Sequence, residues 1–65
     1  MLKCGIIGLG KIGRVRAREI ENYDGAEFVA YHEVSGFDAE VSAKYCTSVD
    51  ELLAQDLDAV FVCAS

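Results

Sequence analysis

The sequence predicts an α/β fold, the first half of a doubly wound parallel sheet. Residues 2–7 and 27–32 have the length and apolar content of strands, and residues 11–22 between them have helical periodicity. Residues 59–63 are apolar without alternation, which is typical of a strand with helices on both faces of its sheet. Strands and helices that alternate in this way favour parallel pairing with right-handed crossovers.

The first helix is expected to follow a glycine-rich break after the first strand. Within residues 11–22, small and apolar residues recur at helical spacing and form one face that can lie against a sheet. These residues are Gly13, Ala17 and Ile20. Turn-forming residues at 22–25 then end the helix before the second strand.

The second half of the chain predicts shorter elements. Residues 33–43 are ambiguous, because they contain a Ser-Gly turn signal and room for two helical turns at most. Residues 44–47 favour a short third strand. Ser48 and Glu51 stand three positions apart before two leucines, which predicts a capping box and a short helix that ends near residues 55–56. The expected order is strand, helix, strand, ambiguous helix, strand, helix, strand.

Composition and charge limit the possible functions. The chain has 65 residues and a mass of 7.0 kDa, so it forms at most one small domain. Its hydrophobic fraction of 52% is typical of a globular protein, and no apolar run approaches the roughly 20 residues that cross a bilayer. The net charge is −5, but residues 1–18 carry +5 and residues 19–65 carry −10. A local basic segment in an acidic chain favours a small anionic ligand over nucleic acid.

The cysteines favour a reducing compartment. Cys4, Cys46 and Cys63 are an odd number without a CxxC pair, and a single histidine completes no zinc pattern. We therefore expect three reduced thiols that pack as small hydrophobic groups, and no metal site. With no secretory leader at the start of the sequence, this points to a cytoplasmic protein.

Residues 8–13 form a GxGxxG motif between a predicted strand and a predicted helix, the context in which this motif binds a dinucleotide. Gly8 allows a sharp turn, Gly10 allows a pyrophosphate to approach the backbone, and Gly13 allows the helix to pack closely. The helix N-terminus adds free N–H groups and a partial positive charge. The alternative is a plain strand-to-helix turn. The predicted cofactor-binding residues of the loop are Gly8, Leu9, Gly10, Lys11, Ile12 and Gly13.

Glu33 lies twenty residues after Gly13, at the end of the second predicted strand. A carboxylate at this place in a Rossmann fold accepts hydrogen bonds from the adenosine ribose. Val34 and Ser35 follow it, with no Arg or Lys to pair with a 2′-phosphate, so NAD is expected as the cofactor rather than NADP. The neighbouring His32 either touches the adenine or faces solvent.

A group of cations supports the same site. Lys11, Arg14 and Arg16 fall in the first turns of the helix, where positive charge opposes the helix dipole. A bound anion would offset this repulsion. For Arg16 and Arg18 a solvated basic face is an equally good interpretation.

Several stretches resemble the glucose–fructose oxidoreductase / inositol dehydrogenase (Gfo/Idh/MocA) family. They are Cys4–Arg14, Gly25–Ala30, Ser48–Leu53 and Leu57–Cys63. The glycine motif is common to many dehydrogenases, whereas the later pair of stretches is more specific. The resemblance implies an NAD-dependent oxidoreductase that transfers a hydride between nicotinamide and a sugar, polyol or similar alcohol.

The resemblance also assigns roles to residues. It implies that Glu33 binds the adenosine ribose and that Ala64 and Ser65, after the fourth strand, lie near the cofactor. The family's catalytic lysine, in a Glu-Lys-Pro motif, and its substrate-binding sheet domain come later in the chain. Residues 1–65 are therefore expected to be a partial dinucleotide-binding domain with no catalytic residue of its own. The link from Glu33 to Lys44 is shorter than the family's usual helix.

Two other interpretations stay open. A non-enzymatic NAD-sensing module uses the same fold, and a truncated gene product would be inactive. The sequence that follows the fourth strand would discriminate between them. Residues 59–63 have the pattern of a central strand but would form a sheet edge here, so association into a homo-oligomer is expected.

Overall fold

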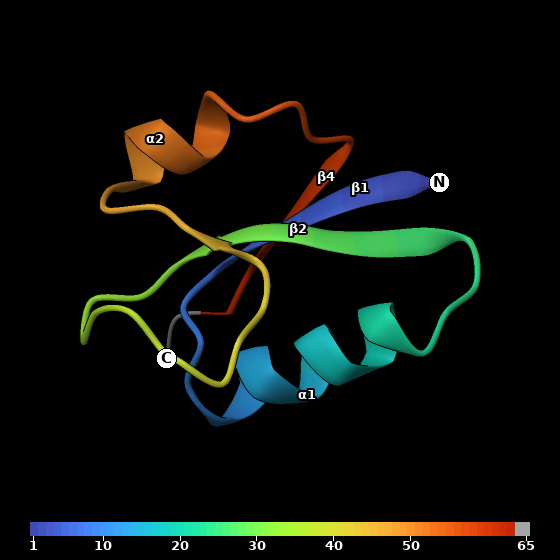
Figure 1. Cartoon of the computed structure of the whole chain (residues 1–65), viewed down its shortest axis with the longest axis horizontal. Coiled ribbons are helices and arrows are strands. Elements are labelled where there is room, and N and C mark those ends of the chain that lie inside the picture. Colours follow the sequence, from blue (N-terminus) through green and yellow to red (C-terminus); the bar gives the residue numbers. More distant parts are fainter. Residues whose placement is uncertain (64–65) are drawn as a thin grey trace.

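The computed structural model describes residues 1–63 and has one four-stranded parallel sheet with a helix on each side (Figure 1). Its elements are β1 (Leu2–Ile7), α1 (Lys11–Glu21), β2 (Ala26–His32), β3 (Lys44–Tyr45), α2 (Val49–Leu53) and β4 (Ala59–Val62). The strand order is β3-β2-β1-β4, and every pairing is parallel. This is the first half of a doubly wound Rossmann sheet, and it confirms the predicted fold class.

The register of β1 brings three strand ends to the same level. Ile7 is opposite His32 of β2 on one side and opposite Val62 of β4 on the other. The β1–β2 register shifts between Cys4 and Gly5. Because the strands are parallel, the residues that follow β1, β2 and β4 all leave the sheet at one edge.

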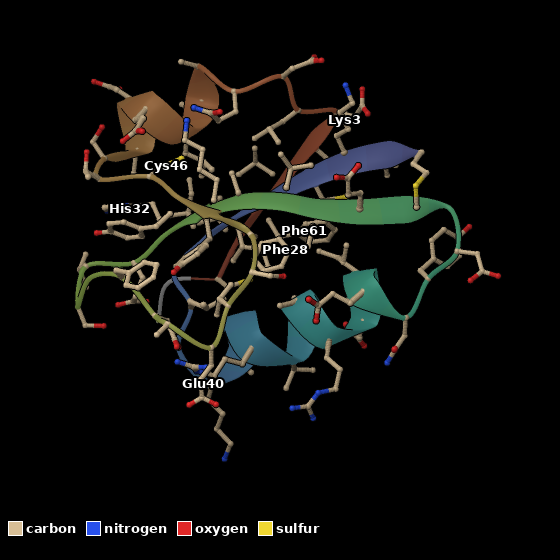
Figure 2. All side chains as sticks on the ribbon, in the orientation of Figure 1. Lys3, Phe28, His32, Glu40, Cys46 and Phe61 are labelled. Atoms are coloured by element: carbon tan, nitrogen blue, oxygen red, sulfur yellow. The ribbon has the colours of Figure 1, made fainter. Side chains whose placement is uncertain are left out.

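The face of the sheet covered by α1 carries the larger core. The predicted inner face of α1 is correct, since Gly13, Ala17 and Ile20 are its buried residues. Ala17 and Ile20 belong to one core cluster with Ile6 of β1 and Tyr31 of β2, both fully buried. Figure 2 shows that Phe28 and Phe61 also point to this side.

The opposite face is covered by α2. Leu52 is fully buried against Ala30 and Cys46, and Figure 2 places Cys46 on this side. The Ser48 hydroxyl accepts a 3.0 Å hydrogen bond from the Glu51 N–H, as the capping box predicts. The Glu51 carboxylate instead accepts from the N–H and hydroxyl of Thr47, at 2.7 and 2.9 Å. The helix also ends earlier than predicted, at Leu53.

Residues 33–43 form an irregular loop without a helix. Gly36 has a φ of +103°, in the left-handed region that glycine adopts freely. The Asp38 carboxylate accepts a 2.9 Å hydrogen bond from the Glu40 N–H, a local turn that competes with helix formation. The third strand is shorter than predicted, because only Lys44 and Tyr45 pair with β2. In the part of the chain that the structure describes, neither helix has the length and apolar character to cross a membrane.

Candidate functional site

The carboxyl ends of β1, β2 and β4 meet at a crevice of about 370 Å³. It is lined by Ile7, Gly8, Gly10, His32, Glu33, Val34 and Cys63. The chain leaves β1 toward β2 on the α1 side and reaches β4 from the α2 side, so this crevice lies at a topological switch point of the sheet. Ligands of open α/β sheets bind at such points.

The glycine loop begins with a turn that only glycine makes easily. Gly8 has a φ of +88°, and its N–H donates a 2.8 Å hydrogen bond to the His32 carbonyl oxygen. A Cβ on Gly13 would lie 2.0 Å from the Gly8 carbonyl oxygen, so α1 packs directly on the loop. The fold therefore requires glycine at the first and last glycine positions of the motif, Gly8 and Gly13.

Gly10 differs from the other two glycines. A Cβ built on Gly10 would have no described heavy atom within 4 Å, and its φ of −76° is accessible to any residue. The fold described here therefore places no demand for glycine at this position. Open space beside a helix start is what a ligand that approaches the backbone needs.

The N-terminus of α1 is suited to an anion. Gly10 is the N-cap residue, the first turn contains no acid, and within residues 1–63 no side chain caps this helix end. The first N–H groups of a helix have no partner inside it, and they carry a partial positive charge. Gly10, at this helix start, lines the crevice together with Glu33.

Glu33 is bound directly to the glycine loop. Its Oε1 accepts a 2.6 Å hydrogen bond from the Leu9 N–H, and its Oε2 accepts from the N–H and hydroxyl of Ser35, at 2.9 and 3.0 Å. The Ser35 N–H, and after it the Leu9 N–H, lower the pKa of Glu33 below the usual value of a glutamate. The structure thus brings the ionised Glu33 carboxylate and the glycine loop together. The sequence predicted these two features as separate parts of one site.

Other predicted site residues lie differently. The Leu9 side chain is buried in the core, and its backbone N–H is bonded to Glu33. The side chains of Lys11 and Ile12 are exposed at the start of α1 and do not line the crevice. Ala64 and Ser65 fall outside the described residues.

Two of the basic residues at the start of α1, Arg14 and Arg16, form ion pairs. Arg16 bonds Glu19 at 2.8 Å, and Arg14 pairs with Asp38 of the 33–43 loop. Arg16 therefore fits the interpretation of a solvated basic face. Arg14 already has an anionic partner within the protein.

Four residues that the sequence analysis did not predict as site residues also line the crevice: Ile7, His32, Val34 and Cys63. Cys63 follows β4, and its position directly after an apolar strand was the available signal. His32 ends β2, and its Nδ1 donates a 2.8 Å hydrogen bond to the Cys46 carbonyl oxygen, which fixes the ring. Cys4 and Cys46 are buried, and burial raises the pKa of both thiols. None of the three cysteines forms a disulfide within the described residues.

These features define a class of protein, the α/β domains built to hold a dinucleotide. Residues 2–65 match the Gfo/Idh/MocA family, described as an oxidoreductase family with an NAD-binding Rossmann fold. The chain belongs to that family, which confirms the resemblance seen in the sequence.

Individual relatives are dehydrogenases and oxidoreductases. The L-aspartate dehydrogenase of Methanococcus maripaludis is 32% identical over 72 residues, covering 100% of this chain and 27% of that protein. An uncharacterized oxidoreductase of Streptococcus pneumoniae is 36% identical over 66 residues, covering 95% of this chain and 18% of that protein. The crystal structure of myo-inositol 2-dehydrogenase from Lactobacillus plantarum superposes with a TM-score of 0.77 and 28% identity, over 98% of this chain and 21% of that one. The chain thus spans about a quarter of the length of the curated relatives it matches first.

Proposed function

We propose that residues 1–65 are the cofactor-binding part of an NAD-dependent oxidoreductase. The observation that carries this proposal is the 2.6 Å hydrogen bond between the Leu9 N–H and Glu33, since it joins the acid at the end of β2 to the glycine loop at the switch point. The open space at Gly10 and the uncapped start of α1 support the same assignment.

The residues have distinct roles in this proposal. The backbone from Gly8 to Gly13, including Leu9, Gly10, Lys11 and Ile12, binds the pyrophosphate through N–H groups at the helix start. Glu33 accepts a hydrogen bond from the adenosine ribose, because Oε1 accepts only the Leu9 N–H and has a second lone pair. Ala64 and Ser65 contact the cofactor after β4.

The bound nicotinamide supplies the hydride chemistry, and this chain supplies binding and orientation. We propose transfer between nicotinamide and a sugar, polyol or similar alcohol, supported by the likeness to myo-inositol 2-dehydrogenase. A second candidate is oxidation of an amino acid, which the 32% identity with L-aspartate dehydrogenase favours. The residues that choose between these substrates belong to other parts of the protein.

The remaining assignments follow from family membership. We propose that the catalytic lysine and a substrate-binding domain are supplied by later sequence, and that the enzyme is a cytoplasmic homo-oligomer. A non-enzymatic NAD-sensing module is the alternative, because the fold does not distinguish binding from turnover.

The test uses the full-length protein. Calorimetric titration with NAD measures binding, and the absorbance of reduced nicotinamide measures turnover with polyols, sugars and amino acids. We expect NAD to bind and one substrate class to be oxidised. Tight binding without turnover of any substrate would favour the sensor, whereas the absence of dinucleotide binding would overturn the proposal.

A further inference from the structure

An ion pair connects α1 to the 33–43 loop, which begins at Glu33. The Arg14 guanidinium donates through Nη2 to Oδ2 of Asp38, a residue 24 positions later in the chain. The Asp38 side chain is only 20% exposed, whereas that of Arg14 is 55% exposed. The acid is therefore the more fixed partner of the two.

Two further contacts hold Asp38 in position. Its main-chain N–H donates a 2.9 Å hydrogen bond to the hydroxyl oxygen of Tyr31, a residue with no exposed surface. Its second carboxylate oxygen, Oδ1, accepts a 2.9 Å hydrogen bond from the Glu40 N–H. The Glu40 N–H, and after it Arg14, lower the pKa of Asp38, so the carboxylate is charged at neutral pH.

Arg14 is placed where it could act on a dinucleotide. It directly follows Gly13, and its N–H donates a 2.9 Å hydrogen bond to the Gly10 carbonyl oxygen. Figure 2 shows Glu40 beside the start of α1, and both Glu40 and Glu33 add to the effect of Asp38 in raising the pKa of the Arg14 guanidinium. A guanidinium near the ribose-binding acid is the group that a 2′-phosphate requires.

We propose that Asp38 is a specificity-determining residue, which pairs with Arg14 and so withholds this cation from the 2′-phosphate of NADP. Glu33 and Asp38 then favour NAD in two different ways. Glu33 repels the phosphate, and Asp38 neutralises the charge that would compensate for the repulsion. The inference rests on the proposed function, because it requires a dinucleotide in the crevice.

The experiment measures dissociation constants of NAD and NADP for the full-length protein and its Asp38→Asn variant. Asparagine keeps the shape of the side chain and an oxygen for the Glu40 N–H, but it removes the charge that pairs with Arg14. We expect the Kd of NADP to fall about threefold or more, while that of NAD changes less than about twofold, the range that a partly exposed ion pair allows.

Three further variants separate the effect of the ion pair from the effect of general charge. Glu40→Gln removes a negative charge near Arg14, and among the described residues the Glu40 side chain forms no hydrogen bond with Arg14. We expect the ratio of the NADP and NAD Kd values to stay within about twofold of the ratio in the unmodified protein. Arg14→Gln in the Asp38→Asn background should cancel the gain. Arg14→Gln alone should leave the ratio unchanged, because its charge is already neutralised.

The outcomes are distinguishable. An unchanged ratio in a folded Asp38→Asn protein, or a gain that survives Arg14→Gln, overturns the inference and leaves dinucleotide binding intact. If Asp38→Asn fails to fold, Arg14→Gln decides, since a selective loss of NADP affinity would show that Arg14 already binds the phosphate. A wild-type protein that binds neither dinucleotide overturns the proposed function and this inference together.

Discussion

Gly13 approaches Gly8 so closely that a Cβ on Gly13 would lie 2.0 Å from the Gly8 carbonyl oxygen. The contact joins the first turn of α1 to the turn that ends β1. Gly8 and Gly13 therefore pack directly against each other, while the third glycine of the motif, Gly10, lies beside open space.

This difference predicts that alanine at Gly13 mainly lowers stability, whereas alanine at Gly10 mainly weakens NAD binding. Gly13→Ala should destabilise the protein by about 1–3 kcal/mol, because backbone must move to relieve the overlap. Gly10→Ala should cost at most about 1 kcal/mol of stability, the difference between glycine and alanine at an N-cap, but should weaken NAD binding. Urea unfolding and calorimetric titration measure the two effects. Equal losses of stability would contradict the distinction between the glycines.

Glu33 should set a preference for NAD over NADP of at least about tenfold. Two like charges about 4 Å apart at an effective dielectric near 20 repel by up to roughly 4 kcal/mol, and water and salt reduce this repulsion. Glu33→Ala should reduce the ratio of the NADP Kd to the NAD Kd. Titration with both cofactors is the measurement, and equal affinities in the unmodified protein would be the opposing result.

Acid should destabilise the protein partly through Glu33. The pKa of Glu33 is lowered in the folded state, so its contribution to stability is present above the unfolded value of about 4.3 and is lost as the pH falls through the folded value. Glu33→Gln should therefore flatten the decline in the free energy of unfolding between about pH 5 and pH 3. Glu21→Gln, at the exposed end of α1, is the control and should decline as the unmodified protein does.

The three thiols should differ in reactivity. Cys4 and Cys46 are 1% and 0% exposed, whereas Cys63 lines the crevice and is half-buried. A thiol reagent should modify Cys63 first, and NAD should slow that reaction. Cys63→Ser should remove the fast phase, and denatured protein should show three free thiols. A fast phase that persists in Cys63→Ser would assign the reactivity to a core cysteine.

The elements predictable from the sequence are those whose signals are local. The bounds of β1 follow from an apolar run, and the inner face of α1 follows from Gly13, Ala17 and Ile20 at helical spacing. The position of Glu33 follows from its distance from the glycine loop. These features need no information about the rest of the fold.

The unpredicted features depend on contacts between distant residues. The 33–43 loop is irregular, and its shape depends on Asp38, which bonds both Arg14 and Tyr31. Arg14 looked available to an anion because its partner lies 24 residues away. Glu51 bonds Thr47 rather than completing the capping box at Ser48, a choice between two adjacent N–H groups that spacing alone does not decide.

The two faces of the sheet have separate cores. The cluster around Ile6, Leu9 and Tyr31 lies on the α1 side and includes a residue of the glycine loop, whereas Ala30, Cys46 and Leu52 form the cluster on the α2 side. Substitutions at positions on separate surfaces without shared partners change stability additively. An engineer seeking a more heat-resistant version of this domain should therefore begin on the α2 side. There a substitution that fills space beside Ala30 or Leu52 changes a cluster to which none of the residues 8–13 belongs.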